Sequence, residues 1–173
     1  VYITMGSTGF LDAFLRRTYA EFAKLPYRFV VTTANQISEE TARMAPPNFR
    51  LCAFAPGSKL LERCSAMIFH GGNGSMYQAL SAGVPMLSLP SHQEQGEITR
   101  VAVQRGFCIR MNARRFRTAK LIQNLHALIQ HPAYRESAQR FTLSVRSANG
   151  AARAADLFEE WAREGKPAGH ALA

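Results

Sequence analysis

Short apolar runs alternate along this chain with longer stretches whose apolar residues recur at helical spacing. The runs predict strands at Val1–Met5, Phe29–Thr33, Phe49–Phe54, Ala66–Phe69, Pro85–Leu89 and Phe107–Met111. Between them, helical spacing of apolar residues predicts a helix at 10–25, and composition and breaking residues predict helices at 37–45, 75–82 and 97–105. Three more helices are predicted after the last strand, at 118–130 with Thr118 as its cap, at 132–144 and at 151–163. This alternation predicts an α/β domain, a Rossmann-like doubly wound parallel sheet of about six strands.

The length of 173 residues is typical of one domain, which we place at 1–164, with a flexible tail at 165–173. No apolar run approaches the roughly 20 residues that a membrane helix needs. The chain starts on a predicted strand and without a methionine, which favours a piece of a longer protein.

The charge balance favours an anionic partner. Lysine and arginine number 21 against 12 acidic residues, for a net charge of +9. The densest basic cluster contains Arg110, Arg114, Arg115 and Arg117. A solvated face explains it best, and contact with phosphate or an anionic membrane comes second. The sequence shows no aromatic-interleaved basic surface of the RRM type, so we predict no nucleic-acid partner.

The numbers of aspartates and cysteines limit the chemistry that the chain can support. The chain has only two aspartates, far apart in sequence, and no Asp-x-Asp pair that could hold a metal on a nucleotide. Phosphate chemistry would then rely on backbone amides and on neutral or basic side chains. Three cysteines without a C-x-x-C motif favour ordinary thiols and a cytoplasmic location.

The glycine-rich segment after the fourth predicted strand is the strongest candidate site. It reads His70-Gly-Gly72-Asn73-Gly74-Ser75 and leads into a predicted helix that Ser75 would cap. Free amides at the helix start, the Ser75 hydroxyl and a hydrogen bond from His70 could hold a diphosphate. A tight structural turn explains the same spacing equally well. The segment matches neither a P-loop nor a complete G-x-G-x-x-G motif.

Other polar residues should reach the same edge of the sheet, because loops after parallel strands emerge together. Glu94 and Gln95 lie in a predicted loop, Ser91–Gly96, that could bind a polyhydroxylated ligand, although a polar turn remains open. Gly6 and Ser7 follow the first strand. Gln78, one helical turn after Ser75, could reach a ribose or lie in solvent. Phe54 could stack on a base or belong to the core.

The stretch from Phe54 to Gln95, with VYITMGS at the start, resembles the donor-binding signature of family 1 glycosyltransferases, the UDP-glucuronosyl and antibiotic type. HGGNGSMYQAL, GVPMLSLP and the Glu-Gln pair match in order and spacing, and the likeness covers nearly the whole chain. It implies the C-terminal, nucleotide-sugar-binding half of a GT-B fold, with the N-terminal acceptor domain absent.

The resemblance also implies a role for each matched residue. The diphosphate of the donor would contact residues of two loops: Gly6, Ser7, His70, Gly72, Asn73, Gly74 and Ser75. Phe54 and Gln78 would bind the nucleoside, and Glu94 and Gln95 the donor sugar. Gln78 stands where the family usually has glutamate, and Gly57 where glutamine is common, so UDP- and dTDP-sugars both stay open.

By the same resemblance, the reaction is an inverting, metal-independent sugar transfer that needs no cofactor. Its catalytic base would lie on the N-terminal domain, so no residue of this chain is predicted to be catalytic and the chain alone should be inactive. The expected partners are the nucleotide-sugar donor and the acceptor domain.

Three alternatives stay open. The chain could be the separate donor-binding subunit of a split, membrane-associated GlcNAc-transferase, which the basic loop around Arg114 would suit. It could be a non-catalytic nucleotide-sugar-binding domain, as Gln78 and Gly57 would allow. A nucleotide-sugar epimerase fits the spacing of the Phe54–Gln95 stretch less well.

Overall fold

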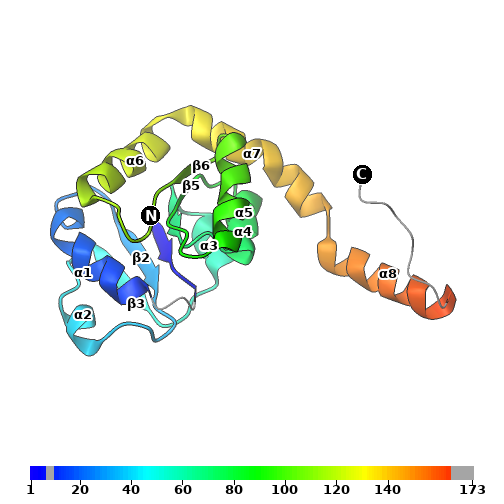
Figure 1. Cartoon of the computed structure of the whole chain (residues 1–173), viewed down its shortest axis with the longest axis horizontal. Coiled ribbons are helices and arrows are strands. Elements are labelled where there is room, and N and C mark those ends of the chain that lie inside the picture. Colours follow the sequence, from blue (N-terminus) through cyan, green and yellow to red (C-terminus); the bar gives the residue numbers. More distant parts are fainter. Residues whose placement is uncertain (7–9, 165–173) are drawn as a thin grey trace.

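A six-stranded, entirely parallel sheet forms the centre of the structure, a computed structural model that describes residues 1–6 and 10–164 (Figure 1). The strands are β1 (Tyr2–Thr4), β2 (Phe29–Thr32), β3 (Phe49–Cys52), β4 (Met67–Phe69), β5 (Met86–Ser88) and β6 (Cys108–Arg110). Their order in the sheet is β3-β2-β1-β4-β5-β6. The predicted doubly wound Rossmann-like fold is therefore confirmed.

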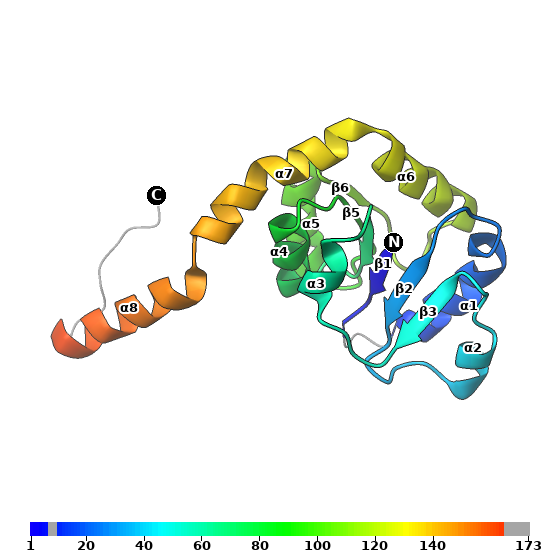
Figure 2. The same cartoon turned by 180° about the vertical axis from the view of Figure 1, so that it is seen from behind.

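Helices cover both faces of the sheet. They are α1 (Leu11–Phe22), α2 (Glu39–Arg43), α3 (Gly57–Leu61), α4 (Asn73–Ser81), α5 (Gln93–Gln104), α6 (Thr118–Gln130), α7 (Pro132–Ser147) and α8 (Gly150–Glu164). Helices α1 and α6 lie on one face, and α3, α4 and α5 lie on the other, as the two opposite views agree (Figures 1 and 2). The β-α-β crossovers require this two-sided cover.

Alternation of side chains along the strands divides the core into two clusters. In β1, Ile3 packs toward α1 and α6, whereas Tyr2 packs toward α3 and α4. The first cluster is aromatic: the ring centroids of Phe22 and Phe29 lie 4.8 Å apart, and those of Phe29 and Phe49 lie 4.7 Å apart. Both faces of the central strands are thus dry, which explains why they read as uninterrupted apolar runs.

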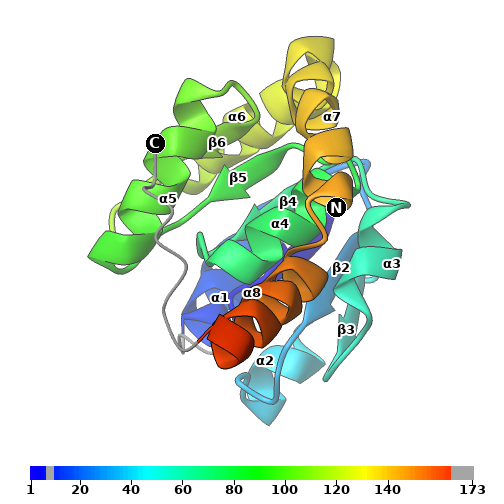
Figure 3. The same ribbon diagram turned by 90° about the vertical axis from the view of Figure 1, so that its right-hand side faces the viewer.

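The last two helices differ in how much of the body they touch. Helix α7 packs across α4, where the Thr142 hydroxyl donates a hydrogen bond to the carbonyl of Leu80 at 2.9 Å (Figure 3). Helix α8 extends away from the sheet and its helices (Figures 1 and 2). Its Phe158 and Trp161 side chains remain 65% and 48% exposed. The predicted tail at 165–173 lies outside the described residues.

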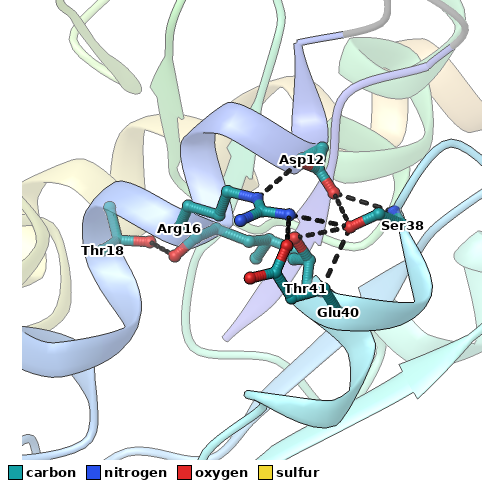
Figure 4. Close-up of polar contacts among 7 residues, drawn as sticks. Asp12, Arg16, Thr18, Ser38, Glu40 and Thr41 are labelled. Atoms are coloured by element: carbon teal, nitrogen blue, oxygen red, sulfur yellow. Dashed lines mark hydrogen bonds and ion pairs between the residues drawn. The ribbon is translucent and has the colours of Figure 1, made fainter.

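An ionic network joins the start of α1 to the start of α2 (Figure 4). The Asp12 carboxylate accepts hydrogen bonds from the Ser38 backbone amide at 2.8 Å and from Arg16 at 2.9 Å. Arg16 also contacts Glu40 at 2.8 Å, and the Ser38 hydroxyl caps α2 by accepting from the Thr41 amide. These bonds hold the pKa of Asp12 at about 2, with the Ser38 amide as the largest cause.

Several predicted boundaries were wrong. Helix α4 begins at Asn73 with Gly72 as its N-cap, so Ser75 lies in the first turn and does not cap the helix. Helix α5 begins at Gln93 and not at 97. Thr118 is the first residue of α6 and not its cap, since its hydroxyl donates instead to the carbonyl of Arg17. Helix α3 was not predicted.

Candidate functional site

The candidate site lies at the carboxyl ends of β1 and β4, the point where the order of the strands reverses. From β1 the chain builds β2 and β3 outward in one direction, and from β4 it builds β5 and β6 in the other. The loops that follow β1 and β4 therefore lead in opposite directions from neighbouring strands, which is where open α/β sheets usually form their ligand crevice. Gly6 lies in the first of these loops and His70 to Gly72 in the second.

The His70 ring occupies a slot between two glycines. A Cβ atom at Gly72 would lie 2.3 Å from His70 Nε2, and one at Gly6 would lie 2.8 Å from His70 Cε1. Gly6 also has a φ of +56°, which favours glycine for a second reason. The side-chain amide of Gln36 holds this loop in place by donating a hydrogen bond to the Gly6 carbonyl at 2.7 Å. Both glycines are thus explained by their close approach to one histidine.

The surroundings of His70 keep its ring neutral at physiological pH. Burial is the main cause that lowers its pKa, and the charge of His92 acts in the same direction, whereas the Thr4 backbone opposes them. Nδ1 is buried and makes no hydrogen bond of good geometry with the described residues. A neutral imidazole has one N–H, and with that proton on Nε2, His70 can donate one hydrogen bond to a phosphate oxygen without carrying a charge.

The start of α4 adds backbone donors beside this ring. The first intrahelical bond at this end runs from the Met76 amide to the Gly72 carbonyl, so the amides of Asn73, Gly74 and Ser75 have no partner within the helix. The first turn contains no acidic residue, and Gly72 supplies no side-chain cap. Asn73 and Gly74 are exposed, and a Cβ at Gly74 would meet only open space. This combination is typical of an anion-binding helix start.

The Glu94-Gln95 pair lies in the first turn of α5 and not in a loop, which corrects the predicted Ser91–Gly96 loop. Glu94 is exposed. Gln95 is only 8% exposed, and its Oε1 accepts hydrogen bonds from the Ser91 amide at 3.0 Å and the Ser91 hydroxyl at 3.2 Å. Gln95 therefore stabilises the turn before α5, while the Glu94 carboxylate is open to a ligand.

The glycine-rich loop and the start of α5 lie against each other, as the shared sheet edge predicts. Gly71 has a φ of +96°, and a Cβ there would lie 2.9 Å from Thr99 Cγ2 and 3.2 Å from Gln95 Cβ. The glycine-rich loop thus packs directly on the first turns of α5. Three residues that support the site were not predicted as site residues: Gly71, Gln36 and Ser91. Each acts through a contact between separate elements, so its sequence context does not mark it as part of a site.

Phe54, Gln78 and Gly57 lie on the other side of the glycine-rich loop. Phe54 is 77% exposed in the loop after β3, so it does not belong to the core. Gln78 Oε1 lies 2.6 Å from the position that a Gly57 Cβ would occupy. The two positions that depart from the family pattern are therefore in contact. Ser7, the remaining predicted residue, lies outside the described residues.

Cysteine and metal chemistry are disfavoured in the described part of the chain. The Cys108 thiol is buried, and burial raises its pKa to about 12, which makes it unreactive. Among residues 1–6 and 10–164, no group of three or more His, Cys, Asp or Glu side chains could hold a metal ion. The parts that remain are backbone donors, one neutral histidine and one exposed carboxylate.

Comparison with known proteins agrees with this geometry. The glycosyltransferase of kitacinnamycin superposes with a TM-score of 0.81 at 25% identity, covering 92% of this chain and 42% of that one. The calicheamicin glycosyltransferase gives a TM-score of 0.83 at 24% identity, with 96% and 42% covered. The fold is therefore that of the GT-B glycosyltransferases.

The sequence defines the family within that class. Residues 16–156 match the family model described as "Erythromycin biosynthesis protein CIII-like, C-terminal domain". The chain belongs to this family of glycosyltransferase C-terminal domains, as the resemblance implied. UDP-glucuronosyltransferase 2B14 of Oryctolagus cuniculus is 30% identical over 118 residues, 67% of this chain. The chain spans 22% of the length of that relative.

Proposed function

We propose that this domain binds the nucleotide-sugar donor of a glycosyltransferase, with the diphosphate in the crevice between the β1 and β4 loops. The observation that carries the proposal is the His70 slot beside the uncapped start of α4. A phosphate group in this crevice would accept hydrogen bonds from the unpaired amides of α4 and from the His70 N–H, the kind of donors that an oxyanion or phosphate site requires.

Each part of the donor has a place in this arrangement. The diphosphate would accept hydrogen bonds from His70 and from the amides of Asn73, Gly74 and Ser75. The nucleoside would extend toward Gln78 and the exposed Phe54, whose ring offers a stacking surface. The sugar would lie toward α5, where the Glu94 carboxylate can accept hydrogen bonds from hydroxyl groups. Gln95 would act indirectly, by holding the turn before α5 and so the position of Glu94.

The same donors suggest how the bond to the sugar is broken. In a single displacement, the acceptor oxygen bonds to the anomeric carbon as the bond from that carbon to the diphosphate breaks, with inversion. Negative charge then grows on the leaving diphosphate, where the preorganised amides and helix end stabilise it. We infer that this stabilisation makes a metal ion dispensable. The proton of the acceptor would pass to a base outside this chain.

The acceptor and the rest of the enzyme belong to the proposal as well. We propose that a second domain, in the same polypeptide or in a partner subunit, binds the acceptor across the crevice. None of the described helices is long and apolar enough to span a bilayer. A cytoplasmic location stays a proposal that rests on the three unpaired cysteines.

Isothermal titration calorimetry of the 173-residue chain with UDP and with dTDP tests donor binding. We expect one of the two nucleotides to bind at a single site, with unchanged affinity when Mg²⁺ is replaced by EDTA. The His70→Ala variant should bind it more weakly. If neither nucleotide binds, or if binding requires Mg²⁺, the proposal is refuted.

A further inference from the structure

The segment between Glu97 and Glu136 contains no acidic residue and eight lysines and arginines: Arg100, Arg105, Arg110, Arg114, Arg115, Arg117, Lys120 and Arg135. This segment alone carries a charge of +8, against +9 for the whole chain. Among the described residues, Arg100 is the only one of these eight in an ion pair, with Glu97 at 2.9 Å. Nearly all the excess charge of the chain thus lies unneutralised in one segment.

The structure gathers four of these cations around one cavity of about 330 Å³ between β6 and the first turn of α6. Its lining includes Arg110, Arg115, Arg117 and Lys120, together with the side-chain amides of Asn112 and Asn124. All four cations are exposed. Like charges this close repel each other, so the arrangement costs folding free energy unless an anion compensates for it.

The loop that presents these cations is held in a defined conformation. Ala113 and Phe116 are buried, which turns the neighbouring arginines outward. Asn112 Oδ1 accepts hydrogen bonds from the amides of Arg114 and Arg115, at 2.9 and 3.0 Å. From α1, Arg17 donates to the Phe116 carbonyl at 2.8 Å and lies 4.0 Å from the centre of the Phe116 ring. The cations are therefore presented on a fixed backbone.

This cavity lies at the same edge of the sheet as the donor site but two strands away, at the end of β6. A neighbouring cavity of about 480 Å³, lined by Ser91, His92 and Gly96, shares Arg110 and Asn112 with it. The two cavities together lead from the basic loop toward the turn before α5. A molecule anchored at the basic loop could thus extend toward the start of α5, where we propose that the donor sugar binds.

We propose that this basic cavity is a second phosphate site, which binds the phosphate group of a molecule other than the nucleotide-sugar donor. Arginine guanidinium groups pair with phosphate oxygens through two parallel hydrogen bonds, and Asn112 and Asn124 offer further donors. The cavity fits a single phosphate group better than a nucleic-acid strand, because its one aromatic residue, Phe116, is buried and offers no base a stacking surface. The phosphate can come from a soluble molecule or from a lipid headgroup.

Residue-resolved NMR on the ¹⁵N-labelled 173-residue chain tests the site with inorganic phosphate at constant ionic strength. We expect saturable shifts of backbone amides within 110–124. The Arg115→Gln/Arg117→Gln variant should weaken this binding roughly tenfold or more, because hydrogen bonds to a charged group are lost. The matched control, Arg63→Gln/Arg153→Gln, removes the same charge from two exposed arginines elsewhere and should retain wild-type affinity.

Vesicle sedimentation distinguishes the two sources of phosphate. Binding to phosphatidylcholine vesicles that contain phosphatidylglycerol, but not to pure phosphatidylcholine, would assign a lipid headgroup if the Arg115/Arg117 variant loses it. Saturable phosphate binding without vesicle binding would assign a soluble ligand. The inference is overturned if no saturable shift occurs within 110–124, or if both double variants bind equally.

This test is separate from the test of donor binding. Failure of the donor proposal would appear as absent UDP shifts at Gly72–Ser75. Failure of the second-site proposal would appear as absent phosphate shifts within 110–124, whether or not UDP shifts Gly72–Ser75.

Discussion

Replacing Gly72 by alanine tests the His70 slot most directly. The backbone angles of Gly72, φ −69° and ψ 141°, suit alanine, so the change adds no backbone strain. Its new methyl group would lie 2.3 Å from His70 Nε2 and 2.8 Å from Cε1. Ordinary contact begins at 3.4 Å, so the ring must move by about 1 Å. Gly6 packs against the other side of the ring and limits how far the ring can move.

A displacement of this size should remove the hydrogen bond that His70 donates to the diphosphate. Hydrogen bonds to charged groups contribute about 1.5 to 3 kcal/mol, and each 1.4 kcal/mol changes affinity about tenfold. We therefore expect Gly72→Ala to weaken UDP or dTDP binding by about ten- to a hundredfold.

Calorimetric titration of four proteins separates this mechanism from a direct clash with the ligand. They are the wild type, Gly72→Ala, His70→Ala and the double variant. If the methyl group acts by moving the ring, the double variant should bind about as well as His70→Ala alone, a strongly non-additive result. Gly150→Ala, whose methyl group would meet only open space, is the matched control. Additive losses, or unchanged affinity in Gly72→Ala, would refute the reasoning.

Three further substitutions test other parts of the structure. Gly57→Ala would place a methyl group 2.6 Å from Gln78 Oε1 and displace that side chain, so it should weaken binding of UDP but not of pyrophosphate in calorimetry. Gln95→Ala should lower the melting temperature, because it removes two hydrogen bonds at a buried position. Asp12→Asn should cost about 1 to 2 kcal/mol in urea unfolding at pH 7, given that the Asp12 pKa falls from 3.8 to about 2 and the side chain is 29% exposed.

The Asp12 prediction also fixes a direction with pH. Because its folded pKa is depressed, the contribution of Asp12 is present above pH 3.8 and is lost as the pH falls toward 2. The difference between wild type and Asp12→Asn should shrink over that window. The control Asp156→Asn, on the exposed side of α8, should have the same unfolding free energy as the wild type at both ends of this pH window. Equal losses of stability in Asp12→Asn and Asp156→Asn would contradict a specific role for the ionic network. For Gln95, the control is Glu94→Ala: if it lowers the melting temperature as much as Gln95→Ala does, the stabilising role of Gln95 is contradicted.

The sheet could be predicted from the sequence because buried parallel strands are continuous apolar runs. All six strands lie within the predicted ranges, which were one or two residues too long at their ends. The start of α5 was missed because Gln93 to Gly96 is polar and contains a glycine, so helical periodicity begins only at Ile98. Helix α3 has five residues, too few for a periodic signal.

The site could be predicted only where it depends on topology. The shared edge of a parallel sheet predicts that the His70 and Glu94 loops meet, and Gly71 does pack on Gln95. The orientation of side chains within the site depends on contacts between distant elements, which no local pattern encodes. Sequence alone therefore did not indicate the slot around His70, the hydrogen bonds that Ser91 donates to Gln95, or the contact between Gln78 and Gly57.

The projecting helix α8 has a practical consequence, since it carries Trp161, the one tryptophan of the chain. The indole is 48% exposed and its centroid lies 6.4 Å from that of Phe158, on a helix that leaves the body of the domain. Its fluorescence should thus be insensitive to nucleotide entering the crevice, and should shift to shorter wavelength only when α8 itself is covered. The domain thereby contains an optical reporter of what docks on α8, separate from the chemistry at the ends of the strands.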